Sequence, residues 1–554
     1  MSVLEPATLL KGFRPIVLLT LLCAVLFAPG LASIPPTDRD EARFMQASKQ
    51  MIESGDWVHI QFQDEPRNKK PIGIYWLQAA AVKVMGQSLT AAWPYRLPSA
   101  LAAWLAVLAV YRCGRKLFSP MAGLIAGATL ATSFIVVVEA HIAKTDATLL
   151  AATTLALTML AEIYVARREN PPLSTALLFW LGLGIGILIK GPIILLVAGA
   201  ALTALCLADR DLSWLKSLRP APGLLLTLII VLPWLIAVSG GAQGNFVANS
   251  LREDLLPKLI GGQESHGAPP GTYIAAALLT AWPWSVLAPF VLVAASQHRT
   301  RPAVRFCLAW LIPAWIIFEI VPTKLPHYTM PLYPALALLT GWALTEGGGA
   351  KDFAAWIGRG AGLAYRIAWA CLAVAMAVGV MYANRMFGDG AKTGALGAAA
   401  AAVLAGAFVI VGFRRGTALS AATGLTAAGV MLTVSLTWGV LPHFRQFAVS
   451  PRIATAIAAH PTTSPVALVG FHEPSAVFLL GTSTVLTDAA GVAGHLLAAP
   501  GALAVVTDDA LDDVRVALTA ADRDITQLED IDGYNYSRGQ WLHLTVITAT
   551  GQRP

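Results

Sequence analysis

The stretch PTDRDEARF, from Pro36 to Phe44, directly follows a long apolar run from Phe13 to Ala32. About 20 apolar residues are enough to cross a bilayer. Many further apolar segments follow, so the run is predicted to be a retained first membrane helix and not a cleaved signal peptide. Asp40 and Glu41 then stand just outside this helix. Charges placed directly at the end of a membrane helix are costly unless they face a polar cavity, so the stretch marks a candidate site.

The composition of the whole chain is that of a polytopic helical membrane protein. Of the 554 residues, 56% are hydrophobic and only 13% are charged, whereas a soluble domain carries about 25% charged residues. The net charge of +7 does not imply a nucleic-acid partner, because loop lysines and arginines orient membrane helices and contact anionic lipid. The five cysteines fall in apolar segments or at their inner ends, so no disulfide is expected.

Thirteen apolar segments are candidate membrane spans. They are 13–33, 94–111, 120–138, 146–166, 173–189, 191–208, 222–240, 271–294, 304–321, 329–346, 366–383, 393–413 and 418–441. Every second connection between them is rich in lysine and arginine, which predicts that these connections are cytoplasmic. The other connections, 34–93, 139–145, 190, 241–270, 322–328 and 384–392, are then outside, together with everything after Leu441.

The two long outer connections and the C-terminal part have their own patterns. Within 34–93, the segment EARFMQASKQMIESGDW places Phe44, Met45, Ser48 and Met51 on one helical face, and PIGIYWLQAAAVKVMG suits a helix lying in the membrane interface. After about Ser450, the runs PVALVGF, TSTVLTD and ALAVVTDD predict short strands separated by helices. The chain is therefore expected to contain a membrane domain over 1–445 and a small α/β domain over 450–554.

The outer connections collect acids and lysines at helix ends, and this points to an anionic, lipid-linked substrate. Lysines supply point charges to phosphate, and a carboxylate can bind a sugar hydroxyl or amine or act as a general base. The candidate catalytic acids are Asp40, Asp146 and Glu41, although Glu41 could instead pair with Arg43. The candidate substrate-binding residues are Arg43, Lys69, Lys70, Lys190, Lys324, His327 and Tyr328.

The order of several motifs resembles one enzyme family. The segments DRDEARFMQASKQMIESGDWV, KKPIGIYW, KTDATL, LIKGP, ESHGAPPGTY and TKLPHYTMPLYPALALL are similar, in this order, to those of the lipid A 4-amino-4-deoxy-L-arabinose transferases. The resemblance covers roughly residues 10–345 and leaves out the C-terminal domain. It implies the GT-C fold, a bundle of membrane helices with its site at the outer face. This is the fold of protein O-mannosyltransferases and oligosaccharyltransferases.

The resemblance also implies a reaction and a place in the cell. The expected donor is undecaprenyl phosphate–aminoarabinose, the expected acceptor is a lipid A phosphate, and the outcome is resistance to polymyxin and other cationic peptides. The enzyme would be an inverting glycosyltransferase, monomeric, in the bacterial inner membrane with its site and C-terminal domain in the periplasm. Asp40 would bind the sugar, Asp146 would assist, and Lys70, with Lys190 or Lys324, would hold the departing phosphate.

Two features of the outer connections bear on a metal ion. Glu264 and His266 could share zinc or another divalent cation, but two ligands are too few and a third would have to come from elsewhere. Lys69 stands where many members of the similar family carry an acidic residue before KP. No cofactor is required by the sequence, and a divalent metal remains one possibility beside a hydrogen-bonded loop.

Other functions remain open on the sequence alone. A related GT-C enzyme could use another polyprenyl-phosphate sugar or a protein acceptor, and the motifs separate these poorly. A lipid or ion transporter could also carry many spans with buried charges, but such proteins place their site near the midplane and often contain inverted repeats. The charges here gather at one face, and no internal repeat is evident. A membrane-anchored binding protein is a third class, without a ligand motif to support it.

Overall fold

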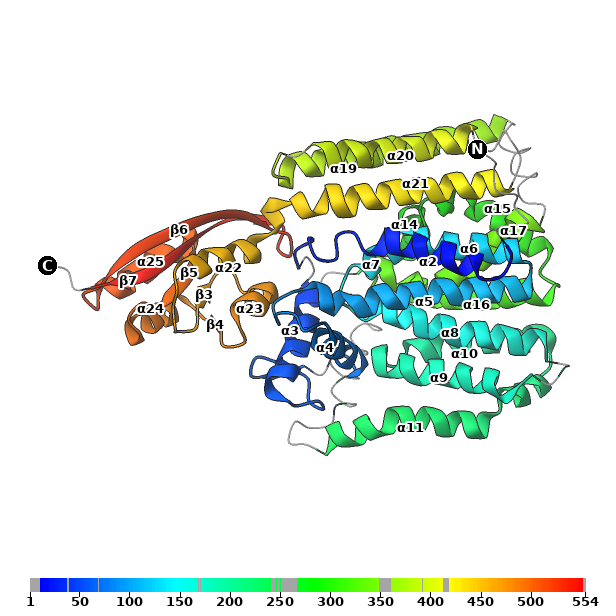
Figure 1. Ribbon diagram of the computed structural model, residues 1–554, viewed down its shortest axis with the longest axis horizontal. Helices are drawn as coiled ribbons and strands as arrows, with labels where there is room; N and C mark the ends of the chain where they lie inside the picture. The colour runs from blue at the N-terminus through cyan, green and yellow to red at the C-terminus, as the bar shows by residue number, and fades with distance from the viewer. Residues whose placement is uncertain are drawn as a thin grey trace.

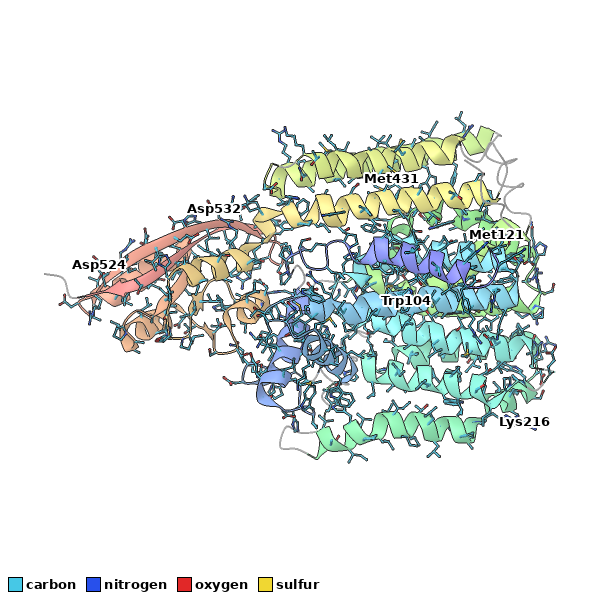
Figure 2. All side chains as sticks on the ribbon, in the orientation of Figure 1. Trp104, Met121, Lys216, Met431, Asp524 and Asp532 are labelled. Carbon is cyan, nitrogen blue, oxygen red and sulfur yellow. The ribbon has the colours of Figure 1, made fainter. Side chains whose placement is uncertain are left out.

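The computed structural model describes residues 10–36, 39–67, 69–167, 169, 171–240, 246, 250, 267–347, 360–390, 392–411 and 418–551. A bundle of long helices lies side by side, and a sheet domain built from the C-terminal residues projects from one end of it (Figure 1). Helix α3 (Arg39–Ser54) crosses the direction of the bundle helices at this end, with α4 (Gly73–Met85) beside it. Lys216, from a connection predicted to be cytoplasmic, lies at the opposite end (Figure 2).

The described bundle contains an α-helix within every one of the thirteen predicted spans. These helices are α2 (Arg14–Phe27), α5 (Trp93–Leu117), α6 (Pro120–Thr132), α7 (Phe134–Ala140), α8 (Asp146–Val165), α9 (Leu173–Lys190), α10 (Ile193–Asp209), α11 (Pro220–Ser239), α14 (Thr272–Thr280), α15 (Ala288–Gln297), α16 (Pro302–Ile320), α17 (Tyr333–Thr345), α19 (Gly360–Phe387), α20 (Thr393–Val411) and α21 (Ala418–Gly439). Short 3-10 turns join some of them: η1 (Ser213–Leu218), η4 (Trp284–Leu287), η5 (Pro326–Leu332), η7 (Leu441–His443) and η8 (Arg445–Phe447).

The lengths and apolar compositions of the observed helices support fewer membrane spans than the thirteen predicted from the sequence. Among the described residues, seven helices are long and apolar enough to cross a membrane, and α6 with α7 adds an eighth if this pair is one span bent by 61°. The predicted continuous span 271–294 is interrupted, because α14 and α15 are separated by the turn η4. The protein is a multi-pass membrane protein, and the total of thirteen spans stays a prediction.

The break between α6 and α7 shows how the bundle accommodates an irregular backbone. Ser133 is extended at this point, and the amide of Phe134 donates to the carbonyl oxygen of Trp282 at 3.1 Å. Unpaired backbone groups are tolerated at membrane depth only where protein neighbours satisfy them. Small residues bring helices close elsewhere: a Cβ on Gly341 of α17 would lie 2.1 Å from the carbonyl oxygen of Ala122 on α6, a close approach typical of membrane helices.

The predicted C-terminal α/β region folds as a mixed sheet covered by helices on both faces. Its strands, in the order β4-β3-β5-β7-β6, are β3 (Ala467–Val469), β4 (Val485–Leu486), β5 (Leu503–Thr507), β6 (Asp524–Asn535) and β7 (Gln540–Thr550). The helices are α22 (Val449–Ala459), α23 (Pro474–Leu480), α24 (Ala489–Ala498) and α25 (Asp508–Thr519). β3 is parallel to β4 and β5, whereas β7 is antiparallel to β5 and β6.

The sheet's two faces follow from alternation along its strands. Leu468 and Val505 pack in the core with α22 and α23, whereas Val469 and Val506 pack in the core with α24 and α25. The three predicted strands are β3, β4 and β5. The long hairpin β6–β7 was not among the predicted strands. A second, smaller hairpin of β1 (Gln61–Phe62) and β2 (Glu65–Pro66) follows α3.

Candidate active site

Asp40 lies in the first turn of α3, where an acid is favoured by the helix dipole. Its side chain is 54% exposed, and its carboxylate lies 3.5 Å from Arg43 and 3.9 Å from Arg67. Partial burial raises the pKa of Asp40, but the positive charges of Arg67, Lys144, Arg43 and Lys70 together hold this pKa below its ordinary value of 3.8. Asp40 is therefore an ionised carboxylate at neutral pH, surrounded by cations from three segments of the chain.

Glu41, the next residue, has a different environment. Its side chain is completely buried, and both of its carboxylate oxygens accept hydrogen bonds from Arg96 of α5, at 2.8 and 3.0 Å. The amide of Ala143 donates to the same carboxylate at 2.9 Å. The predicted pairing of Glu41 with Arg43 is wrong, since Arg43 faces Asp40 one turn away. The buried pair fixes α3 on α5, so its position gives no support to a direct catalytic role for Glu41.

A second group of charges lies where α7 ends, α8 begins and α9 ends, at the end of the bundle that carries α3. Lys190 donates to the carboxylate of Asp146 at 2.5 Å. His327 of η5 stands between two acids, with Nδ1 3.5 Å from Glu139 and Nε2 3.7 Å from Asp146. Lys144 also lies 3.5 Å from Glu139. Burial lowers the pKa of His327 to about 3, against the opposing effect of Asp146, so the imidazole is neutral at physiological pH.

A cavity of about 530 Å³ begins at this charged group and continues between the helices. Its polar wall contains Lys69, Lys70, Asp146, Lys190, His327 and Tyr328. Its apolar walls come from α8 to α11 and α16, with Leu149, Ile193, Leu196, Trp234, Leu235 and Phe318 among the lining residues. A cavity that is apolar along its walls and cationic at one end suits an anionic head group attached to a hydrocarbon chain.

The other predicted substrate-binding residues lie near the cavity in different ways. The ammonium group of Lys190 lies 5.2 Å from the centre of the Tyr328 ring, a cation–π contact. Lys324 is buried and donates to the carbonyl oxygen of Val321 at 2.6 Å, so it closes the end of α16 and does not line the cavity. Asp40 does not line it either, but interacts electrostatically with Lys70, which does.

The predicted metal ligands Glu264 and His266 lie outside the described residues. Within the described part of the chain, no three His, Cys, Asp or Glu side chains come close enough together to hold a metal ion. A metal site at Glu264 and His266 thus stays a prediction.

Four charged residues of the site, Arg67, Arg96, Glu139 and Lys144, were not among the candidates chosen from the sequence. Arg67 precedes the two lysines of RNKKP, and its position in that basic segment was the one available signal. Arg96 lies inside an apolar segment, where a buried charge is costly without a partner. Glu139 is a single acid at the end of the apolar run of α7. For Arg96 the signal was an isolated charge within the predicted span 94–111, and for Glu139 it was a charge directly after the predicted span 120–138.

Comparison with known proteins agrees with this geometry. Residues 69–236 match the family model of the dolichyl-phosphate-mannose-protein mannosyltransferases. The undecaprenyl phosphate-alpha-4-amino-4-deoxy-L-arabinose arabinosyl transferase of Pseudomonas paraeruginosa is 30% identical over 313 residues. This match spans 55% of the chain and 55% of the relative, so the chain spans about half the length of the curated relatives it matches.

Solved structures extend the likeness to nearly the whole chain. The crystal structure of ArnT from Cupriavidus metallidurans in the apo state has a TM-score of 0.72 at 21% identity, over 96% of this chain and 97% of that one. The same protein bound to undecaprenyl phosphate has a TM-score of 0.71, over 97% and 98%. The chain has the GT-C fold. The archaeal oligosaccharyltransferase AglB from Archaeoglobus fulgidus shares this GT-C arrangement, with a TM-score of 0.54 at 11% identity over 90% of this chain and 70% of that one.

The GT-C fold confirms the predicted fold class, and the sequence matches confirm the predicted resemblance to the aminoarabinose transferases. The likeness to ArnT includes the C-terminal domain, because it covers more of the chain than residues 1–445. This differs from the motif resemblance, which ended near residue 345.

Proposed function

We propose that the protein transfers 4-amino-4-deoxy-L-arabinose from undecaprenyl phosphate to a phosphate of lipid A, in the bacterial inner membrane and on its periplasmic side. The cavity carries this proposal, because its lining combines mainly apolar side chains with Lys69, Lys70 and Lys190. A polyprenyl chain would occupy the apolar part and its phosphate would meet the lysines. The crystallised complex of ArnT with undecaprenyl phosphate and the names of the matched relatives favour the same donor.

The charges around the cavity divide into two functions. Lys70 and Lys190 would neutralise the departing polyprenyl phosphate, since lysines act on phosphate as point charges. Asp40, ionised and half exposed, would bind the amine or hydroxyls of the sugar and stabilise the positive charge that develops on its ring. Asp146 assists by holding Lys190 at the cavity wall.

The acceptor decides whether a base is needed. A lipid A phosphate is already anionic, so its oxygen can bond to the anomeric carbon while the bond from that carbon to the polyprenyl phosphate breaks. This single displacement inverts the anomeric carbon and releases undecaprenyl phosphate. No proton has to be removed, which agrees with an acid whose pKa is lowered and not raised.

A complementation experiment tests the proposal. The wild type is expressed in a Gram-negative strain that makes the donor but lacks its own transferase, and the mass of lipid A and growth on polymyxin are measured. We expect a pentosamine-sized mass increase and resistance. Unmodified lipid A, with the protein present in the membrane, would rule out this pair of substrates, and other polyprenyl-phosphate sugars and protein acceptors would then be tested.

Two lysines provide a matched comparison in the same strain. Lys70→Met removes a charge from the cavity wall. Lys116→Met removes a charge from the last turn of α5, away from the cavity, where Lys116 pairs with Glu162. We expect Lys70→Met to lose most of the lipid A modification and Lys116→Met to keep it. Equal losses in the two variants would show that the cavity does not hold the phosphate.

A further inference from the structure

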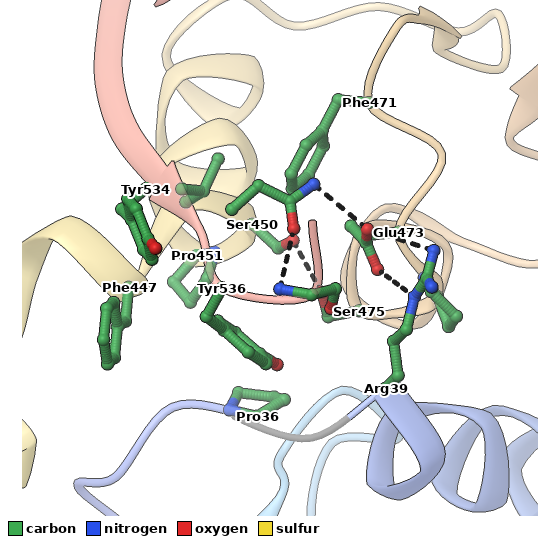
Figure 3. Close-up of a pocket in the computed structure, with 14 residues that line it drawn as sticks. Pro36, Arg39, Phe447, Ser450, Pro451, Phe471, Glu473, Ser475, Tyr534 and Tyr536 are labelled. Atoms are coloured by element: carbon green, nitrogen blue, oxygen red, sulfur yellow. Dashed lines mark hydrogen bonds and ion pairs between the residues drawn. The ribbon is translucent and has the colours of Figure 1, made fainter. Parts of the chain in front are cut away.

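The C-terminal domain docks directly on the helix that carries Asp40. At the junction, the guanidinium of Arg39 donates to both carboxylate oxygens of Glu473, at 3.0 and 3.3 Å (Figure 3). Glu473 is 7% exposed and accepts a third hydrogen bond from the side-chain amide of Asn535 at 3.1 Å. A buried carboxylate is stable only when it is paired and hydrogen-bonded, and Arg39 supplies the pairing charge from across the junction.

Neither Arg39 nor Glu473 stabilises the end of the helix on which it lies. Arg39 is the first residue of α3, where a positive charge is unfavourable because it faces the positive end of the helix dipole. Glu473 occupies the N-cap position of α23, yet its side chain makes no capping hydrogen bond. Both side chains instead reach across the junction. The pair therefore fastens the two parts of the protein at the residue next to Asp40.

A second contact lies three turns along α3. Lys49 is buried and donates to the carbonyl oxygen of Phe478 at 3.0 Å. Phe478 of α23 is itself fully buried and packs edge to face on Tyr95 of α5, at 5.5 Å between ring centres. Its apolar cluster also includes Met45 of α3. The aromatic side chain of Phe478 thus anchors the C-terminal domain in an apolar cluster of the membrane part.

A third contact holds the hairpin that carries Arg67 towards Asp40. The side-chain amide of Gln63, in the turn between β1 and β2, donates to the carbonyl oxygens of Thr482 and Thr484, at 3.1 and 2.6 Å. The hydroxyl of Thr482 also accepts from Gln46 of α3 at 2.8 Å. One short segment of the C-terminal domain therefore holds both the helix of Asp40 and the hairpin of Arg67.

From these three contacts we propose that the C-terminal domain acts as a clamp that positions Asp40 relative to Arg67 and the cavity, with Glu473 as its positioning residue. The three contacts are observed in the structure, whereas the effect of the clamp on sugar transfer rests on the proposed function. Placement of a carboxylate matters because a displacement of about 1 Å of a catalytic group can lower a rate about a hundredfold. The lysines of the cavity wall lie outside the clamp, so donor binding is expected to persist when it opens.

The test compares Glu473→Gln with Ser475→Ala in the full-length purified protein. Ser475 lies in the same junction, but its hydroxyl bonds to Ser450 within the C-terminal domain, at 2.7 Å (Figure 3). Hydrogen exchange of α3 amides is measured together with kcat and KM for the lipid-linked donor. We expect Glu473→Gln to speed exchange in α3 and to lower kcat about tenfold at unchanged KM, within the usual range of coupling energies. Ser475→Ala is expected to resemble the wild type.

A double variant keeps the test decisive if Glu473→Gln disturbs the domain itself. Arg39→Met opens the same contact without touching the domain's interior, and the combination with Glu473→Gln is expected to be no worse than the stronger single change. Unchanged exchange in α3, faster exchange with unchanged kcat, or additive losses in the double variant would each overturn the clamp. Should the wild type transfer no pentosamine, the exchange measurement still tests the clamp while the proposed substrates fail separately.

Discussion

Helix α8 carries an acid near each of its ends, and the two acids have different surroundings. Near the C-terminal end, Glu162 accepts hydrogen bonds from Arg112 and Lys116 of α5 and fastens the two helices together. At the N-terminal end, Asp146 is paired with Lys190 and approached by His327 on the wall of the 530 Å³ cavity. Similar ion pairs thus serve packing at one end and surround a ligand-sized space at the other. Of the two ion pairs of α8, only the pair of Asp146 with Lys190 borders such a space and is a candidate for substrate binding.

The largest loss of transfer rate is expected for Asp40→Asn, in the charged group beside the cavity. The side chain of Asp40 is 54% exposed, and ion pairs of exposed side chains contribute only about 0–1 kcal/mol to folding because water screens them. We expect the transfer rate to fall about 10²–10³-fold, as for other losses of a group that stabilises transition-state charge. The melting temperature in detergent is expected to stay close to that of the wild type. Activity within a fewfold of the wild type would remove Asp40 from the chemistry.

Its neighbour provides the opposite result. Glu41→Gln leaves Arg96 buried without a counter-charge, and breaking a buried ion pair costs about 3–5 kcal/mol of unfolding free energy. We therefore expect a large loss of stability, measured by thermal or denaturant unfolding in detergent micelles. Molecules that remain folded should keep a substantial rate per folded protein. A stable Glu41→Gln variant that has lost its activity would instead restore Glu41 to the catalytic acids.

The contrast between these neighbours marks the limit of what the sequence could predict. The apolar runs predicted where helices lie, because a segment in lipid must satisfy its backbone internally. The alternating charges predicted which connections share an end of the bundle. Neither pattern separates Asp40 from Glu41, since their difference depends on Arg96, a residue 55 positions away that reaches Glu41 only in the folded bundle.

The sheet domain illustrates the same limit. Strand β5 is buried throughout and was predicted from its run of apolar residues. Strand β6 lies at the edge of the sheet, carries several acids and is mostly solvent-accessible, so its sequence contains little strand signal. Its pairing with β7 is what makes it a strand. The clamp residues Arg39 and Glu473 were out of reach for the same reason, because their sequence separation is 434 residues.

His327, on the cavity wall, predicts an effect of pH on stability. Its pKa is lowered from 6.5 to about 3 by burial, so between these values the unfolded chain binds more protons than the folded one. The contribution of neutral His327 to the unfolding free energy is then fully present above pH 6.5 and is lost as the pH drops towards 3. We expect His327→Asn to reduce the loss of stability between pH 7.5 and pH 5 by roughly 1–2 kcal/mol. Melting curves at the two pH values measure this, and an unchanged pH dependence would show that His327 titrates normally.

The smallest effect is expected for Glu162, near the C-terminal end of α8. Glu162→Gln removes a charge whose partners Arg112 and Lys116 are each more than 40% exposed, so water can solvate them. The unfolding free energy should fall by about 1 kcal/mol, and the transfer rate should stay within about twofold of the wild type, as for a surface change. Asp146→Asn, on the same helix, should lower the rate by at least about tenfold, because Lys190 then loses the group that holds it at the cavity. Equal rate losses in the two variants would mean that α8 transmits charge changes along its whole length, and the distinction between a packing end and a functional end would no longer hold.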